Sequence, residues 1–253
     1  MFVHNLDPVF FSIAPVAIYW YGLVYVLGFV GLYFALRRLT SLSAESIDSL
    51  LVWLVGGLFL GARSFFFAFY RPDLFSPLEF FAVWNGGMSF HGGLLGVAGA
   101  LWLWARRHDE DPWVLADIGA LLAGWFLALG RVANFVNAEI LGKPFSGSWC
   151  VLFPGEEVCR HPVQLYAAVK NVFIGSLMVF VYSARSYTPG FIFWLFGLVY
   201  AVLRFSVQFW RDEAVWLLGL QVGHYLSLVL LVVCVWVLGK YYVDDLKNLF
   251  KGV

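Results

Sequence analysis

Four polar side chains recur at helical spacing in an otherwise apolar stretch toward the C-terminal end of the chain. Their intervals of four, four and three residues place them on one face of a helix: Tyr200, Arg204, Gln208 and Arg211. Guanidinium groups bind phosphate and carboxylate oxygens through paired hydrogen bonds. A stripe of two guanidiniums, a phenol and an amide therefore predicts a binding surface for an anion rather than a surface that faces lipid.

A second cluster of polar residues lies in GRVANFVNAE, residues 130–139. Arg131 and Asn134 lie three residues apart and share a helix face, and Asn137 and Glu139 follow at or beyond the helix end. Asn is a poor helix former that often caps helices, so one asparagine alone has a structural explanation. The whole set indicates a binding site at the end of a helix.

The segment SFHGGLLGVAGA, residues 89–100, joins a histidine to a run of small residues. Gly92 and Gly96 form a small-xxx-small pair, which lets another helix or a lipid approach closely, and helix packing accounts for most of this run. Packing does not explain His91, whose imidazole accepts a proton near neutral pH. His91, or a carboxylate such as Glu139, is therefore a candidate for moving a proton.

The elements that must position these residues are membrane-spanning helices. The chain has 253 residues, of which 62% are hydrophobic and 13% charged, with zero formal net charge. Its mean hydropathy is +0.81. A soluble domain is nearer half apolar and a quarter charged, and there is no excess of positive charge to drive binding to a nucleic acid.

A membrane-spanning helix needs about 20 mostly apolar residues. The sequence predicts seven: residues 16–36, 48–70, 90–105, 114–138, 162–183, 190–210 and 221–238. These long runs do not alternate as the strands of a β-barrel do. We therefore expect an all-α integral membrane protein, a single domain over residues 1–253, with small structured caps at 71–89 and 140–161.

The basic residues orient this bundle, because Lys and Arg concentrate in cytoplasmic loops. The segments after the first, third, fifth and seventh stretches hold eight of the 16: Arg37, Arg38, Arg106, Arg107, Arg185, Lys240, Lys247 and Lys251. The segments after the second, fourth and sixth hold four: Arg71, Lys143, Arg160 and Arg211. We expect the N-terminus outside and the C-terminus in the cytoplasm.

The four remaining basic residues fall inside the apolar stretches: Arg63, Arg131, Lys170 and Arg204. Placing Arg at the centre of a bilayer costs about 2.5–3.5 kcal/mol, so such residues usually face a partner or a water-filled cavity. The expected topology puts Arg131, Arg204 and His91 in the outer half of the bilayer. A cavity for an anionic lipid head group, with the acyl chains left in the bilayer, accounts for this gathering.

Two other functions remain open. A transporter of a small anion needs polar residues from one side of the bilayer to the other. The inner half is poor in them, and Asp117 and Lys170 are the main exceptions. Asp117 lies fourteen residues from Arg131, about 21 Å along a helix, so we expect it to be a cap or a structural pair. The other alternative is a non-catalytic lipid-binding protein.

Five segments taken together carry a family resemblance: WYGLVY (20–25), GMSFHGGLLG (87–96), GRVANFVNAE (130–139), RHPVQLY (160–166) and YAVLRFSVQFWRDE (200–213). In this order, and on these predicted helices, they resemble the prolipoprotein diacylglyceryl transferases of bacteria. That family transfers the sn-1,2-diacylglyceryl group of phosphatidylglycerol to the lipobox cysteine thiol of a preprolipoprotein. A thioether forms and glycerol 1-phosphate is released.

The resemblance implies a multi-pass enzyme of the bacterial inner membrane, with its active site toward the extracytoplasmic side. Its partners are phosphatidylglycerol, the signal peptide of the preprolipoprotein and membrane lipids, with no nucleic acid and no metal or organic cofactor. It gives catalytic roles to His91, Arg131 and Arg204. It gives substrate-binding roles to Tyr21, Gly92, Gly93, Asn134, Asn137, Glu139, Tyr200, Gln208 and Arg211. His91 is the first choice for the base and the surroundings of Arg204 are the second.

Three positions depart from the pattern that the resemblance implies. Gln208 stands where family members commonly carry Glu, Ala133 replaces a usual Gly, and Lys170 is an unexpected cation. Cys150 and Cys159 lie in a loop that is expected outside, where oxidation can occur. The sequence leaves both a disulfide and two free thiols open for this pair.

Overall fold

The helices predicted from the apolar stretches are present in the computed structural model, which describes residues 1–13, 16–82 and 86–250. The seven are α1 (Trp20–Leu39), α2 (Ala44–Phe69), α4 (Phe90–Arg107), α5 (Pro112–Val136), α6 (Val163–Ala184), α7 (Phe191–Gln208) and α8 (Val222–Tyr241). Three shorter helical segments are η1 (Pro72–Leu74), α3 (Pro77–Phe81) and α9 (Val243–Phe250). The expectation of an all-α integral membrane protein is confirmed.

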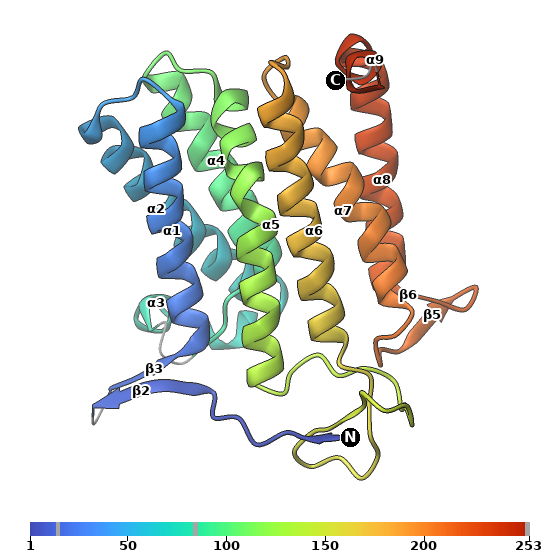
Figure 1. Ribbon diagram of the computed structural model, residues 1–253. Helices are drawn as coiled ribbons and strands as arrows, with labels where there is room; N and C mark the ends of the chain where they lie inside the picture. The colour runs from blue at the N-terminus through green and yellow to red at the C-terminus, as the bar shows by residue number, and fades with distance from the viewer. Residues whose placement is uncertain (14–15, 83–85, 251–253) are drawn as a thin grey trace. The chain divides into compact units, whose positions relative to one another are not determined.

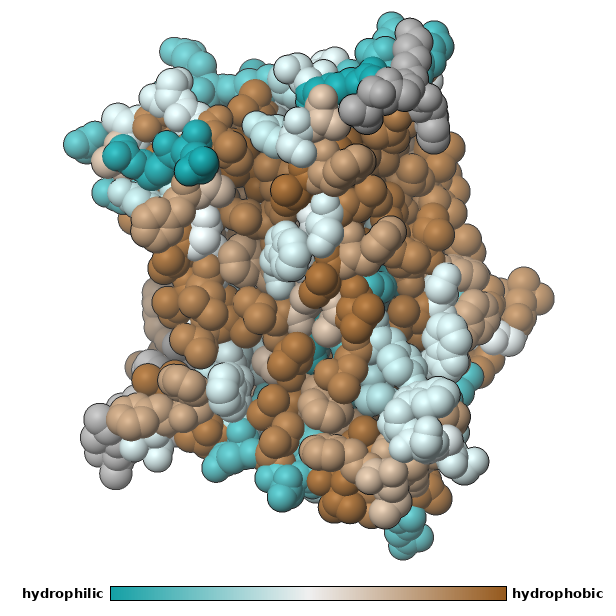
Figure 2. Space-filling view, viewed as in Figure 1, coloured by the Kyte–Doolittle hydropathy of each residue, from teal (hydrophilic) through white to brown (hydrophobic). Residues whose placement is uncertain are grey.

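Six of these helices are long and apolar enough to cross a membrane, among the residues that the structure describes. They are α1, α2, α5, α6, α7 and α8. The remaining helix, α4, carries His91 and ends in Arg106 and Arg107. Brown, hydrophobic side chains cover the middle of the helices in Figure 2, and teal, hydrophilic ones gather near their ends. The chain is thus a multi-pass membrane protein, while the count of seven spans and the outward N-terminus stay predictions.

Short strands connect the helices, and one of them corrects a predicted boundary. The strands are β1 (Phe2–Val3), β2 (Val9–Ile13), β3 (Val16–Tyr19), β4 (Val151–Leu152), β5 (Val215–Leu217) and β6 (Leu220–Gln221). The first predicted span began at residue 16, but residues 16–19 pair with β2 as an antiparallel hairpin. Helix α1 begins at Trp20, whose indole N–H donates to the carbonyl of Asp7 at 3.2 Å.

The chain divides into two compact units (Figure 1). The first comprises residues 1–31 and 116–253, and the second comprises residues 32–115. Helices α1 and α5 each contribute residues to both. The expectation of a single domain over the whole chain stays a prediction.

In the second unit, α2 packs closely on α4 through glycines. A Cβ atom at Gly61 would meet the carbonyl oxygen of Gly92, and one at Gly96 would meet that of Gly57. Backbones approach this closely only where small residues face each other. The predicted packing role of Gly92 and Gly96 is confirmed.

Arg63 of α2 also has a structural role in the second unit. Its side chain is 1% exposed, and its guanidinium donates to the carbonyls of Phe80 at 2.9 Å and Gly87 at 3.0 Å. It also donates to the carbonyls of Glu79 and Gly86. These bonds fix the loop between α3 and α4, so this intramembrane arginine already has acceptors for its N–H groups.

The core of the first unit lies between α5, α6, α7 and α8, which run beside one another in Figure 1. It includes Ile174 and Met178 of α6 and Phe191 and Ile192 of α7, each at most 1% exposed. Helices α5 and α6 approach closely at Gly124, where an added Cβ would lie 2.5 Å from the backbone nitrogen of Gly175. This contact fixes the position of α6 along the axis of α5.

Asp117 fixes the start of α7 from the neighbouring helix α5. Its carboxylate accepts the backbone N–H groups of Gly190 at 2.7 Å and Phe193 at 2.8 Å. The first N–H groups of a helix have no partner within it, and a carboxylate there also favours the helix dipole. The expectation that Asp117 is a cap is confirmed.

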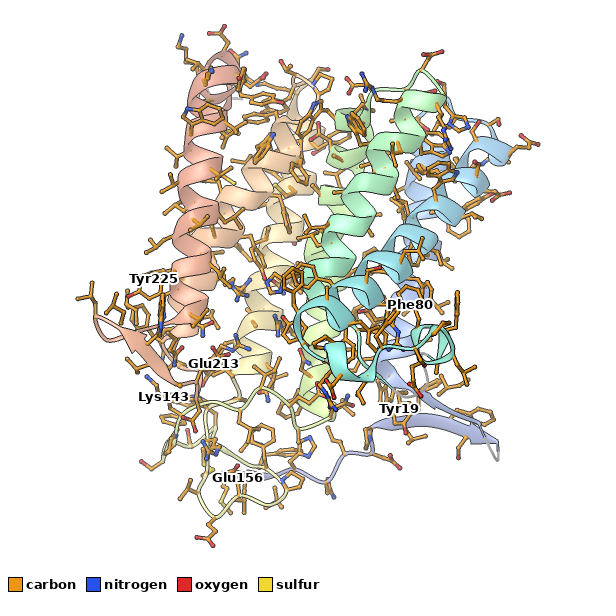
Figure 3. The ribbon with its side chains drawn as sticks, turned by 180° about the vertical axis from the view of Figure 1, so that it is seen from behind. Tyr19, Phe80, Lys143, Glu156, Glu213 and Tyr225 are labelled. Carbon is orange, nitrogen blue, oxygen red and sulfur yellow. A yellow bond between two sulfur atoms is a disulfide. The ribbon has the colours of Figure 1, made fainter. Side chains whose placement is uncertain are left out.

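The segment between α5 and α6 is a small cap built on a disulfide. Cys150 and Cys159 are joined, with their Cα atoms 5.5 Å apart. Arg160 forms ion pairs of 2.6 Å with Glu156 and with Asp212, and Figure 3 shows Glu156, Lys143 and Glu213 at this same end of the first unit. The predicted cap at residues 140–161 is therefore an ordered structure tied to the end of α7.

Candidate active site

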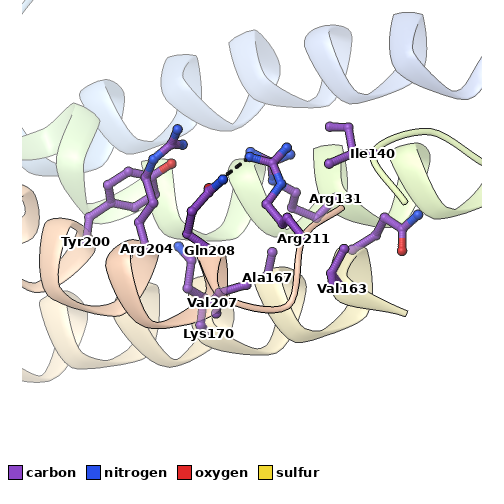
Figure 4. A pocket seen from close by; sticks show the side chains of 11 residues that line it. Arg131, Ile140, Val163, Ala167, Lys170, Tyr200, Arg204, Val207, Gln208 and Arg211 are labelled. Carbon is purple, nitrogen blue, oxygen red and sulfur yellow. Dashed lines mark hydrogen bonds between the residues drawn. The ribbon is translucent and has the colours of Figure 1, made fainter. Parts of the chain in front are cut away.

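A narrow cavity in the first unit collects most of the predicted site residues. Its volume is about 30 Å³, roughly the space that two water molecules require. The residues that line it are Arg131, Ile140, Val163, Gln164, Ala167, Lys170, Tyr200, Arg204, Val207, Gln208 and Arg211. Figure 4 shows these side chains converging from α5, α6 and α7. The cavity suits one small polar group and not an acyl chain.

The polar stripe on α7 faces this cavity, as its spacing predicted. Tyr200, Arg204, Gln208 and Arg211 all line it. Arg211 lies just beyond the end of α7, and its backbone N–H donates to the carbonyl of Gln208 at 3.1 Å. Helical periodicity therefore placed this set correctly.

Gln208 is held in one orientation by acceptors on both sides. Its Nε2 donates to Glu213 Oε2 and to Gln221 Oε1, both at 2.7 Å, and its Oε1 accepts from Arg211 at 3.1 Å. A 180° flip of the Gln221 side-chain amide would lose two hydrogen bonds, because its Nε2 donates to the carbonyls of Arg211 and Glu213. A donor is thus required at position 208, which explains an amide where the family pattern has a carboxylate.

The space for this amide comes from Gly223. A Cβ atom there would lie 2.5 Å from the Cδ atom of Gln208, closer than carbon atoms pack. Gln208 itself is 1% exposed. Its main visible effect is to hold the Arg211 guanidinium at the edge of the cavity.

The end of α5 supplies the second cluster as a chain of hydrogen bonds. Arg131 donates to Asn134 Oδ1 at 3.1 Å, and Asn134 Nδ2 donates to Glu139 Oε2 at 3.0 Å. The same oxygen accepts the hydroxyl of Tyr21 at 2.9 Å, and Glu139 Oε1 accepts from Asn137 at 3.3 Å. The structure thus brings together five residues that the sequence assigned to the site.

A tight turn after α5 returns Glu139 toward Asn134. Ala138 has φ of +54°, and the N–H of Glu139 donates to the carbonyl of Asn134 at 2.9 Å. Such left-handed residues commonly end helices and usually are Gly. The carbonyl of Glu139 then accepts from Gln164 Nε2 at 2.6 Å, which links the turn to α6.

The cavity is strongly cationic. Arg131, Lys170, Arg204 and Arg211 line it, and no Asp or Glu is among the lining residues. Glu213 lies behind it and pairs with Arg211 at 2.9 Å. Burial lowers the pKa of the Arg211 guanidinium, and Glu213 opposes this effect. Uncompensated buried charge is unfavourable, so this arrangement favours an anionic ligand.

Two lining residues were not assigned to the site from the sequence. Lys170 was expected to be an unusual cation in the inner half of the bilayer, but it lines the cavity together with Arg131 and Arg204. Gln164 was part of the RHPVQLY motif without a site role. Gln164 is 1% exposed, and its Oε1 has no hydrogen-bond partner among the described residues. The available signal was helical spacing from the RHPVQLY motif, because Lys170 lies seven residues, about two turns, after Val163.

His91 belongs to the second unit, on the first turn of α4. Its side chain is exposed and its ring lies 5.8 Å from that of Phe90. Gly92 and Gly93 are buried beside it against α2. The participation of these three residues in the site of the first unit stays a proposal.

The fold and the cavity define a class: a multi-pass membrane protein with a cavity lined by arginines. A family model for prolipoprotein diacylglyceryl transferase matches residues 8–239. The chain belongs to this family of membrane transferases.

Curated relatives agree along most of the chain. It is 39% identical over 214 residues to the phosphatidylglycerol–prolipoprotein diacylglyceryl transferase of Oleidesulfovibrio alaskensis, covering 81% of this chain and 80% of the relative. It is 40% identical over 216 residues to the enzyme of the same name from Geobacter sulfurreducens, covering 82% and 83%. The enzyme of that name from Solidesulfovibrio magneticus is 37% identical over 256 residues, covering 95% and 97%. The chain is an enzyme, and the transporter and non-catalytic alternatives find no support.

Proposed function

We propose that this protein transfers the diacylglyceryl group of phosphatidylglycerol to the lipobox cysteine thiol of preprolipoproteins. The named relatives and the family model support this activity. The observation that carries it in the structure is the cavity lined by Arg131, Arg204 and Arg211. Its guanidinium groups suit a head-group phosphate, and the acyl chains remain in the bilayer.

The reaction is a displacement at the sn-3 carbon of the diacylglyceryl group. The cysteine thiolate forms a new carbon–sulfur bond, because the thiolate and not the thiol is the nucleophile. The carbon–oxygen bond to phosphate breaks, and its electron pair stays on the departing glycerol 1-phosphate. Arg131 and Arg204 stabilise the charge that develops on that oxygen, as fixed cations do in other transfer reactions.

The thiol proton goes to His91 in this proposal. A neutral imidazole has a ring nitrogen that can accept a proton, as a general base requires. Asn134, Asn137, Glu139 and Tyr21 form the hydrogen-bonded support of Arg131. Tyr200, Gln208 and Arg211 line the same cavity, and Gly92 and Gly93 are proposed as substrate-binding residues beside His91.

The site faces the extracytoplasmic side of the bacterial inner membrane in this proposal. The excess of Lys and Arg in the predicted cytoplasmic loops supports this orientation. The disulfide between Cys150 and Cys159 also supports it, because disulfides persist in oxidising compartments and are rare in the cytosol. The cap that carries this disulfide adjoins the cavity through Ile140.

The test is a transfer assay with purified protein in phosphatidylglycerol liposomes and a lipobox peptide. We expect a thioether-linked diacylglyceryl peptide, detected by mass spectrometry, and one glycerol phosphate per product. The same peptide with Ser in place of its cysteine should give no product. Release of glycerol phosphate without peptide modification, or anion flux in liposomes without lipid transfer, would contradict the proposal.

A further inference from the structure

Lys170 is the cation of the cavity that the proposed reaction does not use. It lies on α6 and is half-buried. Its ammonium donates to Asn171 Oδ1 at 2.6 Å and lies 4.1 Å from the centre of the Tyr200 ring. Figure 4 shows the side chain extending from α6 toward those of α7. These contacts hold the ammonium at the cavity, and an ammonium has further N–H groups to donate.

Among the described residues, one of the four basic side chains that line the cavity pairs with a protein carboxylate. Arg211 pairs with Glu213 at 2.9 Å. For Arg131, Lys170 and Arg204, no ion pair to a carboxylate occurs among the described residues. Three unmatched cations within a membrane-spanning bundle are costly, so the cavity favours a ligand with more than one negative charge.

The two phosphate species of the proposed reaction differ in this respect. A phosphodiester head group carries a single negative charge, whereas a phosphate monoester carries about −1.5 to −2 near pH 7. The monoester also offers three charged or acceptor oxygens rather than two. Three cations around one small cavity match the monoester better than the diester.

Gln164 adds a second recognition element. Gln164 lines the cavity, and its buried Oε1 has no partner among the described residues. A buried acceptor without a donor costs about 1–3 kcal/mol, and a hydroxyl of the ligand would satisfy it. The lining therefore combines sites for a dianionic phosphate and for a neighbouring hydroxyl group.

We propose that Lys170 makes this cavity selective for a hydroxyl-bearing phosphate monoester dianion over a phosphodiester. This inference rests on the proposed function. If the cavity has this selectivity, the leaving group glycerol phosphate binds more tightly than the head group of the lipid substrate. The enzyme is then inhibited by its phosphate product, and Lys170 is the specificity-determining residue. Arg131 and Arg204 bind both species, so they set affinity but not this preference.

The test measures binding and turnover separately in Lys170→Gln, with Lys170→Arg as the charge-preserving variant and Lys143→Gln as a control. Lys143 lies in the cap and does not line the cavity. Binding of glycerol phosphate to purified protein is measured by calorimetry at pH 7, with inorganic phosphate as a second probe. Inhibition of peptide lipidation by glycerol phosphate is measured in liposomes, together with the KM for phosphatidylglycerol.

We expect Lys170→Gln to weaken glycerol phosphate binding and inhibition about tenfold, and to change the KM for phosphatidylglycerol less than threefold. Lys170→Arg should keep the preference for glycerol phosphate over the lipid head group, because it keeps the positive charge, and Lys143→Gln should behave as the unaltered protein. Binding of glycerol phosphate more tightly than inorganic phosphate supports the role of Gln164. Equal losses for product and lipid substrate, or no loss at all, would overturn the inference.

This experiment separates the inference from the proposed function. Protein that binds glycerol phosphate with the expected dependence on Lys170, but forms no thioether, supports the selective cavity and contradicts the transfer reaction. Protein that lipidates the peptide without being inhibited by glycerol phosphate contradicts the selective cavity alone.

Discussion

Gln208→Glu is the substitution that best probes how the cavity is built, because it restores the carboxylate common in the family pattern. In this chain it removes both N–H groups that Nε2 donates at 2.7 Å, one to the Glu213 carboxylate and one to Gln221. A bond to a charged acceptor contributes about 1.5–3 kcal/mol and one to a neutral acceptor about 0.5–1.5 kcal/mol. The hydrogen bond from Arg211 to Oε1 is kept.

The new carboxylate also faces Glu213, whose side chain is 39% exposed. Solvent screening limits this repulsion at partly exposed positions, so the lost hydrogen bonds dominate. We expect a destabilisation of about 3 kcal/mol, and a change of that size lowers Tm by roughly 6–12 °C in a chain of this length. The assay is thermal unfolding of purified protein in detergent micelles, followed by circular dichroism.

A charge-swapped double variant is the matched control. Gln208→Glu combined with Glu213→Gln exchanges the amide and the carboxylate, so one donated hydrogen bond and the net charge are both recovered. We expect the double variant to be more stable than the sum of the single variants by about 1.5 kcal/mol or more. An unchanged or raised Tm in Gln208→Glu, or strict additivity in the double variant, would refute the assignment of this network.

Three further predictions concern the supports of the site. Ala138→Gly should stabilise the protein by about 0.5–1 kcal/mol. The left-handed conformation at φ +54° costs Ala about 1–2 kcal/mol, and the greater entropy of Gly in the unfolded chain offsets part of the gain. Ala133→Gly, inside α5, should instead destabilise the protein by about 1 kcal/mol, and a measurement of Tm tests both expectations. Asp117→Ala should cost about 2 kcal/mol by the same measurement, since it removes the cap from the N–H groups of Gly190 and Phe193. Burial lowers the pKa of His161 in the folded protein below 6.5, so between this lowered pKa and 6.5 the unfolded chain binds more protons than the folded one. The free energy of unfolding should therefore fall as pH drops through this window. His161→Phe should flatten this part of the plot of stability against pH, and an unaltered slope would contradict the prediction.

The sequence was sufficient to predict those features of the site that depend on a single helix. Apolar length located the seven helices, and the periodicity of 3.6 residues aligned Tyr200, Arg204, Gln208 and Arg211 on one face. Arg131, Asn134 and Glu139 lie within one helix end, so their proximity also follows from local spacing. The packing of Gly92 and Gly96 was predictable because small pairs require a close partner.

The sequence was insufficient where a residue's role depends on another element. Arg63 is one of the basic residues inside the apolar stretches, and its donors go to carbonyls of α3 and of the segment that follows it. Lys170 and Gln164 join the cavity only because α6 lies beside α7. The amide at Gln208 is explained by Gln221, thirteen residues away across a hairpin, which helical spacing does not reveal.

The most direct test of the central claim is lipid transfer by Arg204→Ala, with Arg106→Ala as the matched control. Arg204 lines the cavity, whereas Arg106 lies in the last turn of α4 with its guanidinium 4.7 Å from the Trp102 ring. Both variants are purified, checked for equal Tm, and assayed for thioether formation on a lipobox peptide in phosphatidylglycerol liposomes. We predict that Arg204→Ala loses at least 100-fold in kcat/KM, as removal of one charge-stabilising donor does in other enzymes, while Arg106→Ala keeps full activity. Full activity in Arg204→Ala would contradict the account.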